Sequence, residues 1–190
     1  MDLDKLNTLA VIGDRNSAKT NLLIYLMMEY KGTKKKYLMS YPKEINGFNK
    51  INTMTELSQL TNSIIRIEEI QRVIPFYSKR TNDHLLELLS TMAHNNNTII
   101  FTTCLTQFIA KALDGFIDGF CYTRMKDLGQ LKNGSKCKRR INEFKHHKIN
   151  NWCINLEKGE YLEIIDDNEL SENGIKTFPN MDIKKDWAKI

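Results

Sequence analysis

Short apolar runs alternate along the chain with polar turns and with longer segments of helical periodicity. Runs of four or five apolar or β-branched residues between polar turns are typical of buried strands. Strands are predicted at residues 9–12, 37–40, 63–67, 98–102 and 119–123. Helices are predicted at residues 21–30, from Thr53 or Thr55 to Leu60, at 84–93 behind an Asp83 N-cap, and at 107–113. This alternation predicts an α/β fold in which helices flank a mainly parallel sheet.

The remaining segments lack such periodicity. Residues 43–53 are polar and predict a loop, and residues 71–82, which contain Pro75, predict an irregular connection. Residues 152–165 predict a β-hairpin that turns at Lys158-Gly159, and residues 166–190 predict an extended polar arm. The expected organisation is a core of residues 1–125, followed by residues 126–190 as a basic segment, a small hairpin and a tail that pack on, or extend from, the same domain.

The first predicted strand leads into the sequence GDRNSAKT at residues 13–20, and a helix follows directly. This order is the context of a Walker A motif, in which backbone N–H groups at the helix N-terminus bind phosphates. Lys19 is expected to reach the β- and γ-phosphates of ATP, and the Thr20 hydroxyl to bind Mg²⁺. The alternative is an ordinary strand–turn–helix with a chance Lys-Thr pair. The predicted nucleotide-binding residues are Gly13, Asp14, Arg15, Asn16, Ser17, Ala18, Lys19, Thr20 and Asn21.

One position of this loop departs from the motif, because Ala18 stands where glycine is usual. Alanine adds a methyl group, which the loop tolerates if φ is negative at that residue. We therefore expect a negative φ at Ala18.

Two glutamates, Glu68 and Glu69, directly follow the strand predicted at residues 63–67. A strand that ends in acidic residues downstream of a Walker A loop indicates a Walker B motif, in which we expect Glu68 to bind Mg²⁺ and Glu69 to polarise the attacking water. Glu68 replaces the usual aspartate, and Arg66 interrupts the apolar run, so its charge needs a partner or an exposed position. The alternative is a strand that ends in two solvated glutamates.

Together these motifs resemble the P-loop NTPases of the additional-strand, catalytic-glutamate type, and within them the FtsK–HerA superfamily, especially small viral genome-packaging ATPases. The resemblance covers about residues 8–125 and rests on GDRNSAKT, IIRIEE, STMAHNNNTIIFTT and ALDGFIDGFCYTRM. It implies that the strand ending at Thr103 lies between the Walker A and Walker B strands and that Thr103 senses the γ-phosphate. The family often has Thr-Gln there, whereas this chain has Thr102-Thr103-Cys104, with Gln107 three residues later.

The resemblance also implies partners. Enzymes of this type form homo-oligomeric rings in which an arginine from the neighbouring subunit completes the site, and Arg80 or Arg72 is expected in that role. Loop arginines that are simply solvated are the alternative. DNA, double-stranded and contacted through its backbone, is the expected polymer, and capsid or membrane-associated virion proteins are further candidate partners.

The charge distribution adds a candidate DNA-contacting segment. The chain of 190 residues has a formal net charge of +5, and lysine and arginine are concentrated between residues 126 and 148. Such a segment either binds phosphates without reading bases or is a solvated loop. A competing interpretation is a zinc site made by Cys137, His146, His147 and Cys153, although their spacing matches no known finger. The basic residues expected to contact DNA are Lys132, Lys136, Lys138, Arg139, Arg140, Lys145 and Lys148.

The cysteine pattern and the N-terminus bear on the compartment. The four cysteines include no C-x-x-C pair, which favours a reducing environment. The N-terminus has no apolar signal region, and no stretch approaches the ~20 apolar residues of a transmembrane helix. We expect a soluble cytoplasmic protein, located in the host cytoplasm or the virion if it is viral.

The function that these features favour is ATP hydrolysis coupled to DNA translocation, with viral genome packaging as the setting. One alternative is an assembly ATPase of the zonula-occludens-toxin type. The other is a nucleotide-dependent binding switch that hydrolyses slowly, which the departures at Ala18 and Glu68 leave open.

Overall fold

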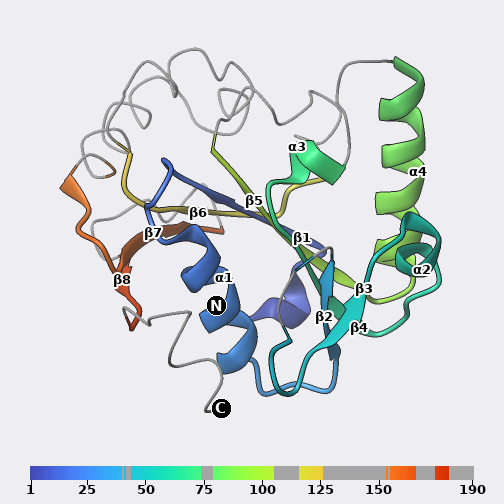
Figure 1. Cartoon of the computed structure of the whole chain (residues 1–190), viewed down its shortest axis with the longest axis horizontal. Coiled ribbons are helices and arrows are strands. Elements are labelled where there is room, and N and C mark those ends of the chain that lie inside the picture. Colours follow the sequence, from blue (N-terminus) through green and yellow to red (C-terminus); the bar gives the residue numbers. More distant parts are fainter. Residues whose placement is uncertain are drawn as a thin grey trace.

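The computed structural model describes residues 1–39, 41, 44–73, 79–104, 116–125, 153, 155–165 and 174–179, with the backbone alone for residues 71 and 79–86. Eight strands form one sheet in the order β3-β2-β4-β5-β1-β6-β7-β8 (Figure 1). The strands are β1 (Thr8–Ile12), β2 (Lys35–Met39), β3 (Asn49–Ile51), β4 (Ser63–Ile67), β5 (Thr98–Thr103), β6 (Gly119–Tyr122), β7 (Glu160–Ile164) and β8 (Ile175–Thr177). The helices are the 3₁₀ helix η1 (Leu3–Lys5) and the α-helices α1 (Lys19–Glu29), α2 (Met54–Ser58), α3 (Ile70–Val73) and α4 (Lys79–His94).

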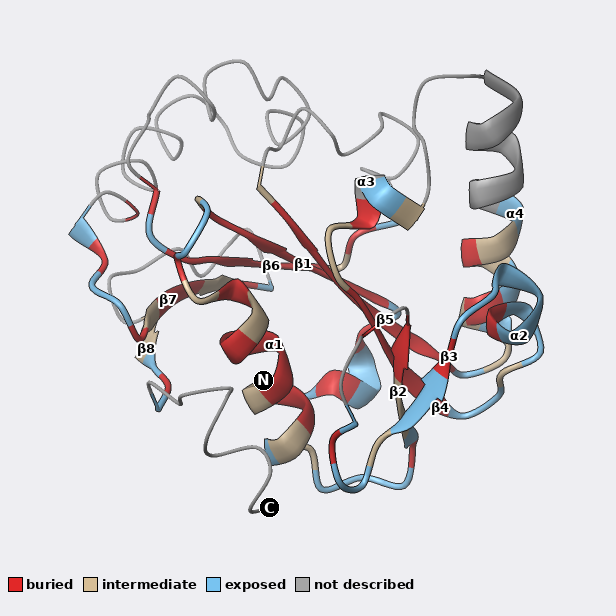
Figure 2. Cartoon of the chain, in the orientation of Figure 1, coloured by how far each residue is buried: buried red, intermediate tan, exposed pale blue. Residues whose placement is uncertain are grey.

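Strands β1 to β6 run parallel to one another, and β7 and β8 extend the sheet in antiparallel fashion. The central strands β1, β4 and β5 are buried along their whole length (Figure 2). Successive residues of β1 serve opposite faces: Leu9 and Val11 pack with α1, whereas Ala10 and Ile12 pack with the side of α2 and α4. Burial on both faces explains why these strands are continuous apolar runs rather than alternating ones. The predicted α/β fold with a mainly parallel sheet is confirmed.

All five predicted strands form, with small shifts at their ends. The short helix α2 begins behind Thr53, whose hydroxyl accepts a hydrogen bond from the Glu56 N–H at 3.1 Å. The Glu56 carboxylate accepts one from the Thr53 N–H at 3.0 Å, which completes a capping box. The helix predicted at residues 107–113 lies outside the described residues.

Two predictions about the polar connections are wrong. Residues 49–51, predicted as part of a loop, form the edge strand β3, in which only Ile51 is buried. Helix α4 begins at Lys79, inside the segment predicted as irregular, so Asp83 lies within the helix and is not its N-cap. Both elements lack an apolar pattern at these positions, because pairing with β2 and packing of the later turns of α4 decide them, and propensity is only a weak preference.

The hairpin predicted to turn at Lys158-Gly159 is also wrong in its pairing. Cys153 and Asn155 are helical, so the first arm does not form a strand. The second arm is β7, which pairs with β6 and with β8, a strand in the segment predicted as an extended arm. The backbone N–H of Met125 donates to the carbonyl oxygen of Cys153 at 3.1 Å, and this contact ties the helical residues to the end of β6.

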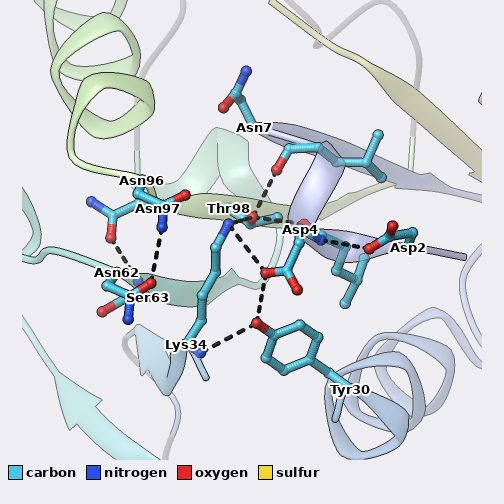
Figure 3. Close-up of polar contacts among 12 residues, drawn as sticks. Asp2, Asp4, Asn7, Tyr30, Lys34, Asn62, Ser63, Asn96, Asn97 and Thr98 are labelled. Atoms are coloured by element: carbon cyan, nitrogen blue, oxygen red, sulfur yellow. Dashed lines mark hydrogen bonds and ion pairs between the residues drawn. The ribbon is translucent and has the colours of Figure 1, made fainter. Parts of the chain in front are cut away.

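A polar cluster ties the N-terminal segment to the amino-terminal edge of the sheet (Figure 3). The buried ammonium group of Lys34 donates to the Thr98 hydroxyl at 2.9 Å and lies 3.8 Å from the Asp4 carboxylate. Asp4 also accepts from the Tyr30 hydroxyl at 2.6 Å, and Thr98 donates to the Leu6 carbonyl at 2.7 Å. This cluster is at the amino end of β5, so the opposite, carboxyl-terminal edge is left for the chemistry described next.

Candidate nucleotide-binding site

The predicted Walker A loop, the two glutamates and the end of β5 meet at one edge of the sheet. β5 lies between β4 and β1, as the resemblance implied for the strand ending at Thr103. Because these strands are parallel, their carboxyl ends bring residues 13–20, residues 68–69 and residues 103–104 together. Ligands of open α/β sheets bind at this kind of edge.

The loop is fixed by hydrogen bonds to both strands that flank β1. The Gly13 N–H donates to the carbonyl oxygen of Thr103 at 3.4 Å, and the Asp14 N–H to that of Arg124 at 3.2 Å. The hydroxyls of Ser17 and Thr123 lie 2.6 Å apart. A Cβ atom at Gly13 would lie 1.9 Å from the Thr123 hydroxyl oxygen, so no residue larger than glycine fits there without a shift. Thr123, which the sequence analysis did not assign, is therefore a support of the loop.

The expected negative φ at Ala18 is wrong. Ala18 has φ 65° and ψ 21° and is the N-cap of α1, and Asn16 has a positive φ of 62°. The left-handed conformation puts Cβ close to the following carbonyl oxygen, which costs an L-residue roughly 1–2 kcal/mol. The loop must turn sharply into α1 at this point, so the geometry that glycine usually provides is imposed on alanine.

The Lys19 side chain lies over the loop. Lys19 is buried, and its ammonium group donates to the carbonyl oxygens of Gly13 at 2.9 Å and Asp14 at 2.7 Å. These carbonyls stabilise the charge by their dipoles but do not neutralise it, which leaves a positive group suited to an anionic ligand. The residues therefore fit a phosphate group.

Thr20 and Glu68 are in contact. The Thr20 hydroxyl donates a hydrogen bond to Oε1 of Glu68, and Oε2 of Glu68 lies 2.8 Å from Nη2 of Arg66. A hydroxyl and a carboxylate oxygen at the first turn of α1 are donors that Mg²⁺ prefers, so these two residues fit the metal. Arg66, expected to need a partner or an exposed position, is fully buried and has Glu68 as its ion-pair partner.

Glu69 is held by the end of β5. Its φ is 50°, and its N–H donates to the Thr102 hydroxyl at 2.8 Å. The Cys104 thiol donates to Oε1 of Glu69 at 3.1 Å, and the Lys19 ammonium lies 3.6 Å from the same sulfur. Burial, followed by the hydrogen bond to Glu69, raises the pKa of Cys104 above its ordinary value, so this side chain remains a protonated donor. Cys104 and Thr102 were missed as site residues, although their place at the end of the strand between the two motifs pointed to them.

The other predicted residues are less uniformly placed. Asn21 and Thr103 are buried, Asp14 is half-buried, and Arg15 and Asn16 are exposed. Arg72 is exposed on α3, and Arg80 lies in the part of α4 for which only the backbone is described. The γ-phosphate role of Thr103 and the arginine roles remain predictions.

Of the predicted zinc ligands, Cys137, His146 and His147 lie outside the described residues, as does the whole basic segment. Cys153 is buried, and burial raises its pKa to about 12, which disfavours the thiolate that a metal requires. Among the described residues, no three His, Cys, Asp or Glu side chains are grouped as metal ligands. A membrane-spanning helix is likewise absent from this part of the chain.

Three solved structures share this architecture. The genome packaging NTPase B204 from Sulfolobus turreted icosahedral virus 2, in complex with ATP-gammaS, aligns over 95% of this chain and 100% of its own, with 14% identity and a TM-score of 0.65. B204 from Sulfolobus turreted icosahedral virus, described as a DNA-packaging ATPase, gives the same coverage and identity and a TM-score of 0.66. The pCW3 conjugation coupling protein TcpA, with ATPgS, aligns over 87% of this chain and 59% of its own, with 12% identity and a TM-score of 0.55.

No protein-family model and no curated protein sequence matches the chain significantly. At such low identity the structural similarities establish the fold, and the loop, the glutamates and the strand order agree with it. This chain has the P-loop NTPase fold.

Proposed function

We propose that this protein is an ATPase that couples hydrolysis to the movement of DNA, as a genome-packaging motor. The observation that carries the proposal is the convergence of Lys19, Thr20, Glu68 and Glu69 at one sheet edge, with the first three engaged by loop carbonyls or by one another. The packaging NTPases and the conjugation coupling protein among the structural neighbours support the choice of DNA as the polymer.

The residues divide the work of binding in the following way. Backbone N–H groups of the loop and the N-terminus of α1 bind the phosphates, and Lys19 gives up its carbonyl partners to contact the β- and γ-phosphates. Thr20 and Glu68 hold Mg²⁺, which neutralises charge on the β- and γ-phosphate oxygens. Thr103, beside the loop at the end of β5, contacts the γ-phosphate.

Glu69 acts as the general base. It accepts a proton from the attacking water, and its backbone and carboxylate are oriented by Thr102 and Cys104. Arg80 or Arg72 of a neighbouring subunit contacts the γ-phosphate across the interface of a homo-oligomeric ring. The need for this arginine in trans is why the proposal includes a ring.

The proposal divides the chain into an ATPase core of residues 1–125 and a C-terminal part, residues 126–190, whose basic segment contacts DNA. Lysine and arginine in this segment bind backbone phosphates and release counterions, so affinity falls steeply with salt. The setting is the host cytoplasm or the virion, beside capsid or membrane-associated virion proteins.

Steady-state ATPase assays with and without duplex DNA test the proposal. DNA is expected to stimulate turnover. Lys19→Ala is expected to reduce turnover about 100-fold or more by weakening phosphate contacts. Glu69→Gln is expected to keep ATP·Mg²⁺ binding and to lower kcat by on the order of 10²–10⁴-fold. Parent-like turnover in the Lys19→Ala variant would contradict the phosphate site.

DNA binding is tested separately with the triple variant Lys138→Ala, Arg139→Ala, Arg140→Ala. The log–log salt slope of duplex binding is expected to flatten by about two to three units, since each contact contributes about 0.9. Different sequences should weaken equally, and DNA-independent hydrolysis should stay near the parent rate. An unchanged affinity and slope would remove DNA translocation from the proposal and leave a nucleotide-dependent switch.

A slow nucleotide-dependent switch is the second candidate, and the Cys104–Glu69 hydrogen bond favours it. A carboxylate that already accepts the thiol proton at 3.1 Å is less available to a water molecule. DNA-independent turnover that is slow, and that the DNA-contact variants do not alter, is the result expected for the switch.

A further inference from the structure

Arg66 is a buried charge inside the strand that carries the two glutamates. Its side chain has no solvent exposure, and its guanidinium carbon lies 4.2 Å from the centre of the Tyr41 ring. Nε and Nη1 have no hydrogen-bond partner among the residues that the structure describes. Nη2 lies 2.8 Å from Oε2 of Glu68, whose side chain is one-third exposed. The Glu68 carboxylate therefore provides the charge that compensates this guanidinium.

The position of Arg66 in β4 directs it to the metal ligand. In the parallel ladder Arg66 lies between Leu38 of β2 and Ile100 of β5, so apolar neighbours flank it on both sides. Residues two apart in a strand share a face, and Glu68 follows Arg66 by two. Glu68 is consequently held at both carboxylate oxygens, with Oε2 at Arg66 and Oε1 accepting from the Thr20 hydroxyl.

We propose that Arg66 is a positioning residue for Mg²⁺ binding, and that Arg66 and Glu68 are a matched pair that replaces the usual apolar residue and aspartate of a Walker B strand. This inference rests on the proposed function. A glutamate has one more rotatable bond than an aspartate, so a free glutamate at this position samples more orientations. Anchoring one oxygen to Arg66 fixes the longer side chain with its other oxygen at Thr20.

The pairing accounts for both departures from the sequence pattern at once. An aspartate at position 68 is one methylene shorter and does not reach the guanidinium from the same backbone, which leaves a buried charge uncompensated. An apolar side chain at position 66 leaves the glutamate unanchored. A buried ion pair without such a role is often replaced by apolar residues with no loss of stability, so its presence at the metal ligand indicates positioning.

A double-mutant cycle tests the pair with the full-length chain: parent, Arg66→Met, Glu68→Asp and the combined variant R66M/E68D. Each single change is expected to raise the Mg²⁺ concentration for half-maximal binding of a fluorescent ATP analogue about tenfold or more, as is common for groups that orient metal ligands. The combined variant, which restores the usual combination, is expected to return within about threefold of the parent. Binding of the analogue in EDTA should be the same for all four.

Stability of the protein without nucleotide and Mg²⁺ gives an independent readout. Glu68→Asp is expected to lower the urea midpoint in the Arg66 protein and to have little effect in the R66M background. If Glu68→Asp alone fails to fold, folding of R66M/E68D supports the pair, and Arg66→Met still reports on Mg²⁺, because its glutamate is partly solvated. Ile64→Met, a change on the same face of β4, is the control and should leave the Mg²⁺ dependence at the parent value.

Parent-like Mg²⁺ dependence in Arg66→Met, or additive defects in R66M/E68D, would overturn the inference while leaving the proposed function intact. Absence of Mg²⁺-dependent ATP binding in the parent would instead contradict the proposed function itself. The two failures are therefore distinguishable.

Discussion

The Cys104 thiol donates a hydrogen bond to Glu69 at 3.1 Å, and this contact joins the strand β5 to the proposed general base. The same sulfur lies 3.6 Å from the Lys19 ammonium, so one small side chain touches both the phosphate-binding cation and the base. Because burial keeps the thiol protonated, it acts as a donor and restricts the directions in which the carboxylate can point.

Removal of this donor is expected to slow hydrolysis with little effect on binding. Cys104→Ala should lower kcat about tenfold, because a hydrogen bond to a charged group contributes about 1.5–3 kcal/mol. Cys104→Ser retains a donor of similar size and should recover most of the rate, with KM near the parent value in both variants. Steady-state ATPase kinetics measure both quantities. A rise in kcat in Cys104→Ala would show instead that the thiol restrains Glu69, in agreement with the slow-switch alternative.

Glycine at position 18 is expected to stabilise the protein. Ala18→Gly relieves a left-handed alanine and should raise the free energy of unfolding by about 1 kcal/mol, or the Tm by about 2–4 °C. Thermal and urea unfolding measure the change. Asn16→Gly is the matched control in the same loop, since asparagine already tolerates a positive φ, and its effect should be clearly smaller. An equal or destabilising effect at position 18 would contradict the strain.

Alanine at position 13 should disrupt the loop. The added Cβ would meet the Thr123 hydroxyl at 1.9 Å and the Ser17 hydroxyl at 2.6 Å, so Gly13→Ala must displace the loop. We expect a loss of about 1–3 kcal/mol in stability and a weakened affinity for ATP, measured by unfolding and by fluorescent-nucleotide titration. Gly47→Ala is the control, because its Cβ meets nothing within 4 Å although its φ is 78°. That variant should lose some stability and keep the parent affinity.

The buried Lys34 should make stability depend on alkaline pH. Burial lowers its pKa below the ordinary 10.5, although the nearby Asp4 opposes this shift. The unfolded chain therefore binds this proton more tightly, and the folded protein gains stability as pH rises through the folded pKa towards 10.5. Relative to Lys34→Met, the parent should gain stability between pH 8 and 10.5 in urea unfolding. Lys35→Met, at an exposed neighbouring position, should show a constant difference from the parent, and the same constant difference for Lys34→Met would refute the assignment.

The sequence by itself determined the parallel core and the location of the site. Continuous apolar runs such as residues 63–67 identify strands buried on both faces, and the loop GDRNSAKT between a strand and a helix identifies the phosphate site. Local patterns suffice there because the chemistry and the burial both act on consecutive residues. Thr53 and Glu56 are a further local case, since both capping-box partners lie within one turn.

Tertiary structure alone decided the features in which distant segments meet. The short polar strand β3 and the pairing of β7 with β6 and β8 depend on neighbouring strands, which no periodicity within those segments records. The left-handed φ of Ala18 follows from the path between β1 and α1, and not from the preference of alanine. The contact between Cys104 and Glu69 and the burial of Arg66 beneath Tyr41 arise because adjacent parallel strands bring the ends of separate segments together, and this proximity is created only when the sheet assembles.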